Sequence, residues 1–238
     1  AGLQGYVHVI DISRPEEPRQ IGQIAAGKEI THVAASPTDP YKIAFADKIS
    51  DLNGAGFIQA NATETNWTVK HVELTLGSRI DWFDINNATG VTFYTDTDGT
   101  DYAFVAGFNA MLQGVPSHDV TLYPTKQIGA NIGVIRDPFG EAKLLGATQG
   151  IENGFLDNLA ISADGGYLLG GYRGAHGVLI YDIRKLIDTA TAHVEGLQHQ
   201  PIEFFDDTVL VNTFSTGAGS HPQGLDTQIV SVTLSQPD

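Results

Sequence analysis

One strand pattern occurs twice in the sequence, at residues 6–12 (YVHVIDI) and at residues 178–183 (VLIYDI). Both stretches are rich in β-branched and aromatic residues and end in Ile-Asp-Ile or Tyr-Asp-Ile, and residues 133–138 (GVIRDP) are a fainter copy. Such runs, bounded by Pro, Gly, Asp or Asn, are typical of short β-strands. Asp137 and Asp182, in the last two copies, are 45 positions apart. The spacing predicts repeated units of several strands each.

A second pattern supports the repeat, because residues 33–43 and 159–169 both contain an apolar strand, a turn with Ser and Asp, and a strand led by Tyr. The rest of the chain alternates in the same way, with almost no helical spacing. We expect one short helix at residues 183–192, placed on a loop, and strands at residues 6–12, 19–25, 30–35, 41–46, 55–60, 66–75, 80–85, 91–95, 101–107, 131–136, 142–148, 157–162, 166–172, 177–183, 207–214 and 227–234.

Residues 6–18 (YVHVIDISRPEEP), followed by Ile21 and Gly22, resemble an LVIVD repeat, and the hairpin at residues 162–167 (SADGGY) is similar to blades of YncE-like and lactonase-like propellers. The alternating strands indicate an all-β protein, and the resemblance implies a β-propeller or propeller fragment. Counting the hairpins gives about 4–5 four-stranded antiparallel blades. Seven blades would need about 300 residues, so the chain could also be part of a seven-bladed ring. We expect residues 1–238 to form a single propeller-like domain, and the start at Ala1 suggests a piece excised from a larger protein.

Composition excludes several classes of function. The chain of 238 residues has a formal net charge of −15, which repels nucleic acid and attracts cations, including calcium. No run of about 18 apolar residues occurs, so we expect no membrane insertion. The absence of cysteine excludes disulfides and a thiolate nucleophile.

Residues 96–101 (DTDGTD) are the sharpest local motif. Asp96, Asp98 and Asp101 could direct several oxygens at one calcium ion, which prefers such ligands. An EF-hand loop would need Glu at position 107, where the sequence has Gly. Asp and Gly are also favoured in hairpin turns, so the motif predicts either a calcium site or a plain turn.

Resemblance to lactonase-like propellers implies a metal-assisted or His/Arg-based hydrolase with polar residues at the mouth of the channel. Its candidate residues here are His176, Arg173, Asp157 and Asn158. The eight histidines, which include His32, show neither HxH nor HExxH spacing, but ligands from separate blades can converge on the axis of a propeller.

Four aromatic residues offer a third kind of site. Trp67, Trp82, Phe83 and Tyr94 could form a platform for stacking a carbohydrate, or they could lie in the core.

The expected function is that of a non-enzymatic interaction or scaffold propeller. Such a module of an exported or cell-surface protein, extracellular or else periplasmic, would bind a protein or carbohydrate through loops on one face. One alternative is a lactonase-like or metal-dependent hydrolase with its site on the propeller axis. Another is a calcium-stabilised adhesion module.

Overall fold

The computed structural model describes residues 5–39, 41–47, 54–60, 67–72, 75–76, 83–84, 86–109, 129–148, 155–173, 177–196 and 210–215. These residues form three four-stranded antiparallel sheets in which each strand pairs with the next one along the chain. Sheet 1 contains β3 (Ile30–Ala35), β4 (Lys42–Asp47), β5 (Ala55–Ala60) and β6 (Trp67–Val72). Sheet 2 contains β9 (Asn86–Thr95), β10 (Asp101–Asn109), β11 (Gly129–Arg136) and β12 (Lys143–Ala147). Sheet 3 contains β13 (Phe155–Ile161), β14 (Tyr167–Arg173), β15 (Gly177–Asp182) and β16 (Leu210–Ser215).

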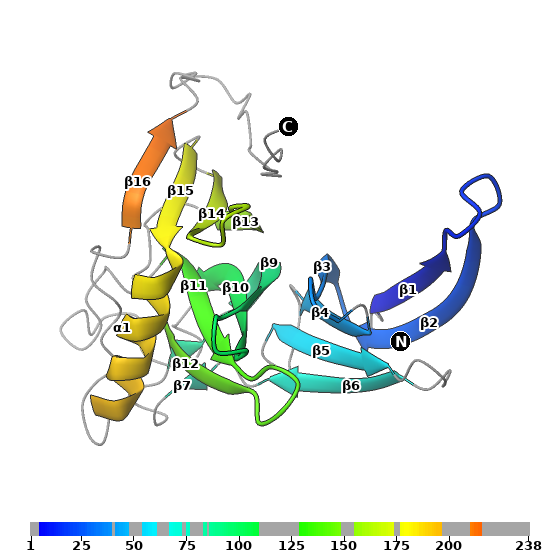
Figure 1. Cartoon of the computed structure of the whole chain (residues 1–238), viewed down its shortest axis with the longest axis horizontal. Helices are drawn as coiled ribbons and strands as arrows, with labels where there is room; N and C mark the ends of the chain where they lie inside the picture. The colour runs from blue at the N-terminus through cyan, green and yellow to red at the C-terminus, as the bar shows by residue number, and fades with distance from the viewer. Residues whose placement is uncertain are drawn as a thin grey trace, which may run out of the picture.

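Two shorter pairs accompany the three sheets. An N-terminal hairpin joins β1 (Gly5–Asp11) to β2 (Arg19–Gly27), and β7 (Thr75–Leu76) pairs with β8 (Phe83–Asp84). The hairpin and sheets 1 to 3 follow one another in a curved array, with the hairpin at one end and sheet 3 at the other (Figure 1). The prediction of an all-β protein made of four-stranded antiparallel sheets is confirmed. The strand predicted at residues 227–234 lies outside the described residues.

The Asp residues that recur in the repeated strand pattern occupy the same structural position, at the end of the third strand of a sheet. Asp137 directly follows β11 and Asp182 ends β15, each the third strand of its sheet. The carboxylate of Asp182 accepts a hydrogen bond from Lys185 N–H at 2.9 Å, and that of Asp137 accepts one from Glu141 N–H at 3.0 Å. Asp11 at the end of β1 likewise accepts a hydrogen bond from Ser13 N–H at 2.9 Å. The repeat therefore marks where a third strand stops, and β1 has the pattern of a third strand.

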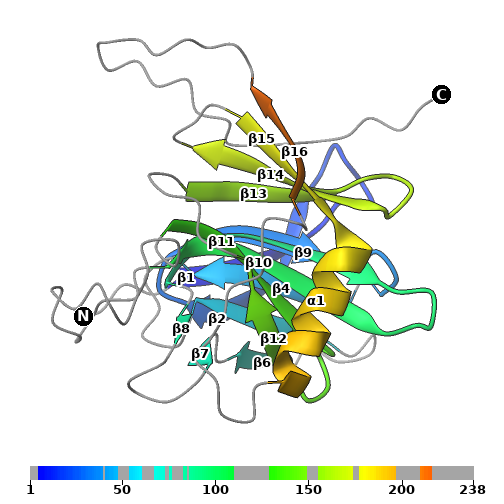
Figure 2. The same ribbon diagram turned by 90° about the vertical axis from the view of Figure 1, so that its left-hand side faces the viewer.

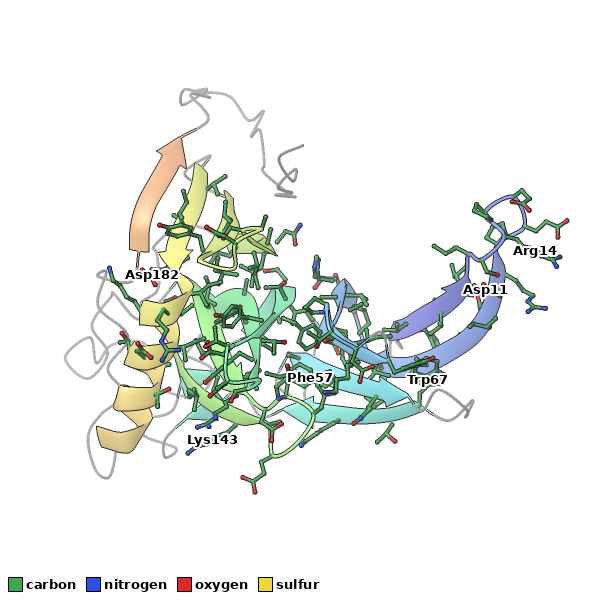
Figure 3. The ribbon with its side chains drawn as sticks, in the orientation of Figure 1. Asp11, Arg14, Phe57, Trp67, Lys143 and Asp182 are labelled. Atoms are coloured by element: carbon green, nitrogen blue, oxygen red, sulfur yellow. The ribbon has the colours of Figure 1, made fainter. Side chains whose placement is uncertain are left out.

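The hydrophobic core lies between the layers, because each sheet has apolar side chains on both faces (Figure 3). Phe104 and Val105 are neighbours in β10 and therefore point to opposite faces, Phe104 toward sheet 3 and Val105 toward sheet 1. Phe45 of β4 points the other way, toward the hairpin, where it meets Val7 and Ile24. Burying one such side chain contributes about 1.5–3 kcal/mol, so the stacking of layers stabilises the fold.

Gly56 shows how closely one strand approaches the next. It lies opposite Phe45 in the register of β4 and β5, and a Cβ atom at position 56 would overlap the Phe45 ring. The ring is fully buried in this position. A side chain at residue 56 would displace it, which explains the glycine in this strand.

The predicted helix is present as α1 (Ile183–Gly196), but its place differs from the expectation. We expected it on a loop, whereas Figure 2 shows it lying along the sheets, and it packs against β12 and β11. Its apolar face, Ile183, Leu186, Ile187 and Ala190, is buried in the cluster between sheets 2 and 3. The described helix is too short to span a membrane.

Candidate functional site

The turns between the first and second strands of sheets 1, 2 and 3 share one hydrogen-bonding pattern. In each turn an Asp carboxylate accepts a hydrogen bond from the backbone N–H two residues later. The pairs are Asp39 and Tyr41 at 2.9 Å, Asp98 and Thr100 at 2.8 Å, and Asp164 and Gly166 at 3.0 Å. We call residues 36–39, 96–100 and 162–166 the turn row. The carboxylates hold the loop backbone in place, as Asx turns do.

Electrostatics and backbone geometry agree with this local role. The backbone N–H of Thr100 lowers the pKa of Asp98. The pKa of Asp164 is also lowered, first by the Ser162 hydroxyl, which donates at 2.6 Å, and then by the Gly166 N–H. Gly99 and Gly165 have φ values of +84° and +73°, a conformation that favours glycine. The Asp-Gly pairs of the sequence are therefore turn residues in sheets 2 and 3.

Asp96 is the most buried carboxylate of the predicted calcium motif, with a side chain only 8% exposed. Its Oδ2 lies 2.7 Å from Nη1 of Arg184 in α1, and its Oδ1 accepts the Thr97 N–H at 2.7 Å. Burial and then the charge of Asp96 raise the pKa of the neighbouring Tyr94. Asp96 therefore anchors the first turn of α1 to sheet 2.

Asp101 binds partners on another side of the same loop. Its Oδ2 lies 3.2 Å from Nζ of Lys42 in sheet 1, and its Oδ1 accepts the Thr95 hydroxyl at 2.8 Å. The carboxylates of Asp96, Asp98 and Asp101 thus bind three different sets of groups. No three His, Asp or Glu side chains in the described residues are close enough to hold a metal ion. As placed, the motif does not form a shared calcium site, and calcium binding stays a prediction.

Contacts between neighbouring sheets lie directly beside the turn row, whose three turns we treat as one surface. Lys42 connects sheet 1 to sheet 2 through Asp101, and its Nζ also lies 5.2 Å from the ring centre of Phe139. A Cβ atom added at Gly165 of sheet 3 would lie 3.6 Å from Cε2 of Tyr94 in sheet 2, so the two sheets approach each other here. Beside this surface Tyr41 and Tyr167, which lead the second strands of sheets 1 and 3, are each 41% exposed.

The opposite end of the first strands carries a second repeated feature, a β-bulge in each strand. The residues left out of the pairing are Thr31 in β3, residues 87–89 in β9 and residues 157–158 in β13. The Thr31 hydroxyl donates to the carbonyl of Ala88 at 2.9 Å, and the Thr89 hydroxyl donates to the carbonyl of Leu156. These bonds join the three first strands side by side. We call this the bulge end.

Most of the predicted hydrolase residues fall at the bulge end. Asp157 and Asn158 form the bulge of β13, and Arg173, the last residue of β14, is close to them because it pairs with Phe155. The side chains of Asp157 and Arg173, and the whole of His176, lie outside the described part of the structure. The backbone brings three of the four residues to one end of sheet 3, and their catalytic roles stay predictions.

His32 lies one residue beyond the bulge of β3 and is half-buried. Burial lowers the pKa of its imidazole, because the charged form is less well solvated there.

The aromatic residues do not form one platform in the described structure. Trp67 packs into the cluster between the hairpin and sheet 1, whereas Tyr94 packs against the cluster between sheets 2 and 3. Trp82 and the side chain of Phe83 lie outside the described residues. The two that can be placed are thus separated by whole layers.

Asp47 is a structural residue that the sequence did not point to. Its side chain, at the end of β4, is almost fully buried and accepts hydrogen bonds from Lys28 N–H and Glu29 N–H, both at 2.8 Å. It thereby attaches the loop after β2 to sheet 1. No motif surrounds Asp47, and the only signal is a charged residue at the close of an apolar strand.

Comparison with known proteins supports the fold through structure alone. No protein-family description and no curated protein matches the chain. Among solved structures, Kuenenia stuttgartiensis hydrazine synthase matches with a TM-score of 0.59 and 17% identity, over 89% of this chain and 56% of that one. The Pseudomonas aeruginosa periplasmic gluconolactonase PpgL matches with a TM-score of 0.52 and 14% identity, over 89% and 52%.

At such low identity the likeness shows the fold and nothing more. The chain spans about half the length of the two structures that it matches. The solved structures similar to this chain are β-propellers, and the three stacked four-stranded sheets described above have that architecture.

Proposed function

We propose that this chain is a non-enzymatic interaction module built on β-propeller sheets, and that the turn row is its recognition surface. The observation that supports this most is the repeated Asx hydrogen bond in all three turns, combined with the Lys42–Asp101 and Arg184–Asp96 ion pairs between elements. A surface held in this way loses little conformational entropy on binding, which favours affinity.

The chemistry of the surface suggests its class of partner. Asp98 and Asp164 are exposed and charged at neutral pH, as aspartates are even without the lowering of their pKa. Tyr41 and Tyr167 add exposed aromatic area of the kind that carries binding energy in protein interfaces. Together with the net charge of −15, these groups suit a protein partner with a basic surface.

The proposed setting is an exported or cell-surface protein. It is supported by the resemblance of residues 6–18 to LVIVD repeats and of residues 162–167 to YncE-like blades.

A defined peptide library displayed on phage would test the proposal. We expect the chain to select peptides rich in Lys and Arg, and the double variant Tyr41→Ser/Tyr167→Ser to bind them at least about tenfold more weakly by calorimetry, as loss of interface anchors predicts. The control is Thr31→Val at the bulge end, which should bind as the wild type does.

Two results would overturn the proposal. One is selected peptides that bind the tyrosine variant and the wild type equally well. The other is reproducible hydrolysis of lactones by the purified chain that disappears in Asp157→Asn and His176→Ala but persists in the tyrosine variant, which would favour an enzyme working at the bulge end.

A further inference from the structure

The N-terminal hairpin has two faces, of which sheet 1 covers one. Val7, Ile24 and Ala26 are buried against sheet 1. The other side carries Tyr6, Ile10, Ile21 and, just beyond β1, Ile12, which are four of the seven exposed large hydrophobic side chains in the described residues. His8 and Gln20, which are joined by a hydrogen bond of 3.1 Å, lie among them. We call these four residues the hairpin outer face. Figure 3 shows the hairpin, with Asp11 and Arg14 at its tip, extending away from the rest of the molecule.

The other end of the array also has an apolar face. Leu168 and Leu179 of sheet 3 point into the cluster shared with sheet 2, so their neighbours Leu169 and Ile180 point to the opposite side. Ala160, Leu169 and Ile180 are aligned across β13, β14 and β15 by the register of these strands. They are half-buried and belong to none of the clusters that join the described layers. We call these three residues the sheet 3 outer face.

From these two faces we infer that a second copy of this chain docks head to tail, with the hairpin outer face of each copy on the sheet 3 outer face of the other. The contact would continue the series already present, in which the hairpin packs on sheet 1, sheet 1 on sheet 2 and sheet 2 on sheet 3. The inference is independent of the turn row and of the function proposed for it.

The size of the array agrees with two copies. One chain supplies three four-stranded sheets and a hairpin, and it spans 56% and 52% of the propellers that it matches. Two copies would therefore supply about as many layers as one of those structures. The array is curved, with both ends turned to the same side in Figure 1, so two head-to-tail contacts can close a twofold ring.

The tip of the hairpin would form the polar rim of this contact. Asp11, Arg14, Glu17 and Arg19 carry charges of both signs around a hollow of about 310 Å³. Apolar centres with polar rims are the usual composition of protein interfaces.

The first test is the mass in solution by sedimentation equilibrium, measured on the full chain of 25.4 kDa. We expect about twice this mass at micromolar concentration for the wild type, and the monomer mass for Ile10→Asp/Ile21→Asp. Ile10 is 52% exposed and Ile21 is 55% exposed, so the variant should keep the wild-type circular dichroism spectrum. Thr97→Asp in the turn row is the matched control and should stay dimeric.

The second test uses the lack of cysteine in the chain. Under mild oxidation, Ile10→Cys protein mixed with Ile180→Cys protein should form a disulfide-linked heterodimer, and neither variant alone should be cross-linked to the same extent. This measurement decides the matter even if the aspartate variant fails to fold. If the wild type is monomeric at all concentrations, the inference that a second copy docks here is overturned, and the two faces would be contact surfaces for other propeller blades. A cross-link formed by Ile10→Cys alone would overturn the head-to-tail arrangement.

Discussion

Sheet 2 and the N-terminal hairpin have the same kind of strand sequence but different environments. In β10 of sheet 2, Phe104 and Val105 point to opposite faces and both are completely buried, because sheets 3 and 1 cover the two faces. In β1 of the hairpin, Val7 is buried whereas Ile10 is 52% exposed. A thin sheet with apolar residues on both faces thus has both faces fully buried only when it lies between two neighbours.

The largest expected effect comes from a substitution in sheet 2, whose two faces are both covered. Phe104→Ala should lower the free energy of unfolding by about 3–5 kcal/mol, since it removes a fully buried ring and leaves a cavity. Ile10→Ala in the hairpin should change it by about 0.5 kcal/mol or less when measured at a concentration where the chain is monomeric. Urea unfolding of both variants measures the difference. Equal losses would show that the hairpin is as well covered as sheet 2.

The second prediction concerns the link between the two regions. Asp47→Ala removes a carboxylate that accepts hydrogen bonds from two backbone N–H groups of the loop after β2. The expected loss of stability is about 2–3 kcal/mol, because hydrogen bonds to charged groups are strong and the donors would be left unsatisfied. Asp39→Ala, which removes a single such bond in an exposed turn, should cost about 1 kcal/mol. Thermal unfolding compares the two, and a smaller loss for Asp47→Ala than for Asp39→Ala would contradict the proposed role of this residue.

The strands and the repeat could be read from the sequence because they depend on local alternation and on turn residues. Residues 30–35 were expected as a strand and form β3 with the same limits. The short helix at Ile183 was also expected, since Leu186, Ile187 and Ala190 share a face. Its place against sheets 2 and 3 was not, because no local pattern says which surface an apolar helix face will meet.

The candidate site was less predictable, because its contacts also join residues that are far apart in the sequence. The Asp-Gly turn was visible in residues 96–101, but the choice of Arg184 as partner of Asp96 joins residues 88 positions apart. The bulges at Thr31 and at residues 157–158 share no residue type, and a bulge is defined by the pairing of two strands rather than by either sequence.

The third prediction concerns the ion pair between Lys42 and Asp101 at the junction of sheets 1 and 2. A double-mutant cycle with Lys42→Met and Asp101→Asn should give a coupling energy of about 0.5–1 kcal/mol, because both side chains of this ion pair are partly shielded from solvent. The same cycle on the exposed pair of Arg19 and Asp11 in the hairpin, 3.9 Å apart, should give a value close to zero. A hairpin pair that couples as strongly as the junction pair would contradict the difference in shielding between the two regions.

The smallest effect is a dependence on pH that comes from His32 in the packed part of the array. Burial holds its pKa below 6.5 in the folded chain, whereas the unfolded chain has the ordinary value. Above about pH 6.5 both states are neutral at this residue, so His32 adds no slope. As the pH falls below that value the unfolded chain takes up the proton first, so stability decreases until the folded form is also protonated.

His32→Gln should therefore lose less stability than the wild type between about pH 7 and pH 5.5 in urea titrations. Asp98→Asn should keep the wild-type slope in this range, because the pKa of Asp98 is lowered in the folded chain and its contribution is lost only as the pH falls toward and below the ordinary aspartate value of 3.8. If His32→Gln and the wild type have the same slope, the imidazole is as well solvated in the folded chain as in the unfolded one, and the first strand of sheet 1 is less covered than its neighbours in sheet 2.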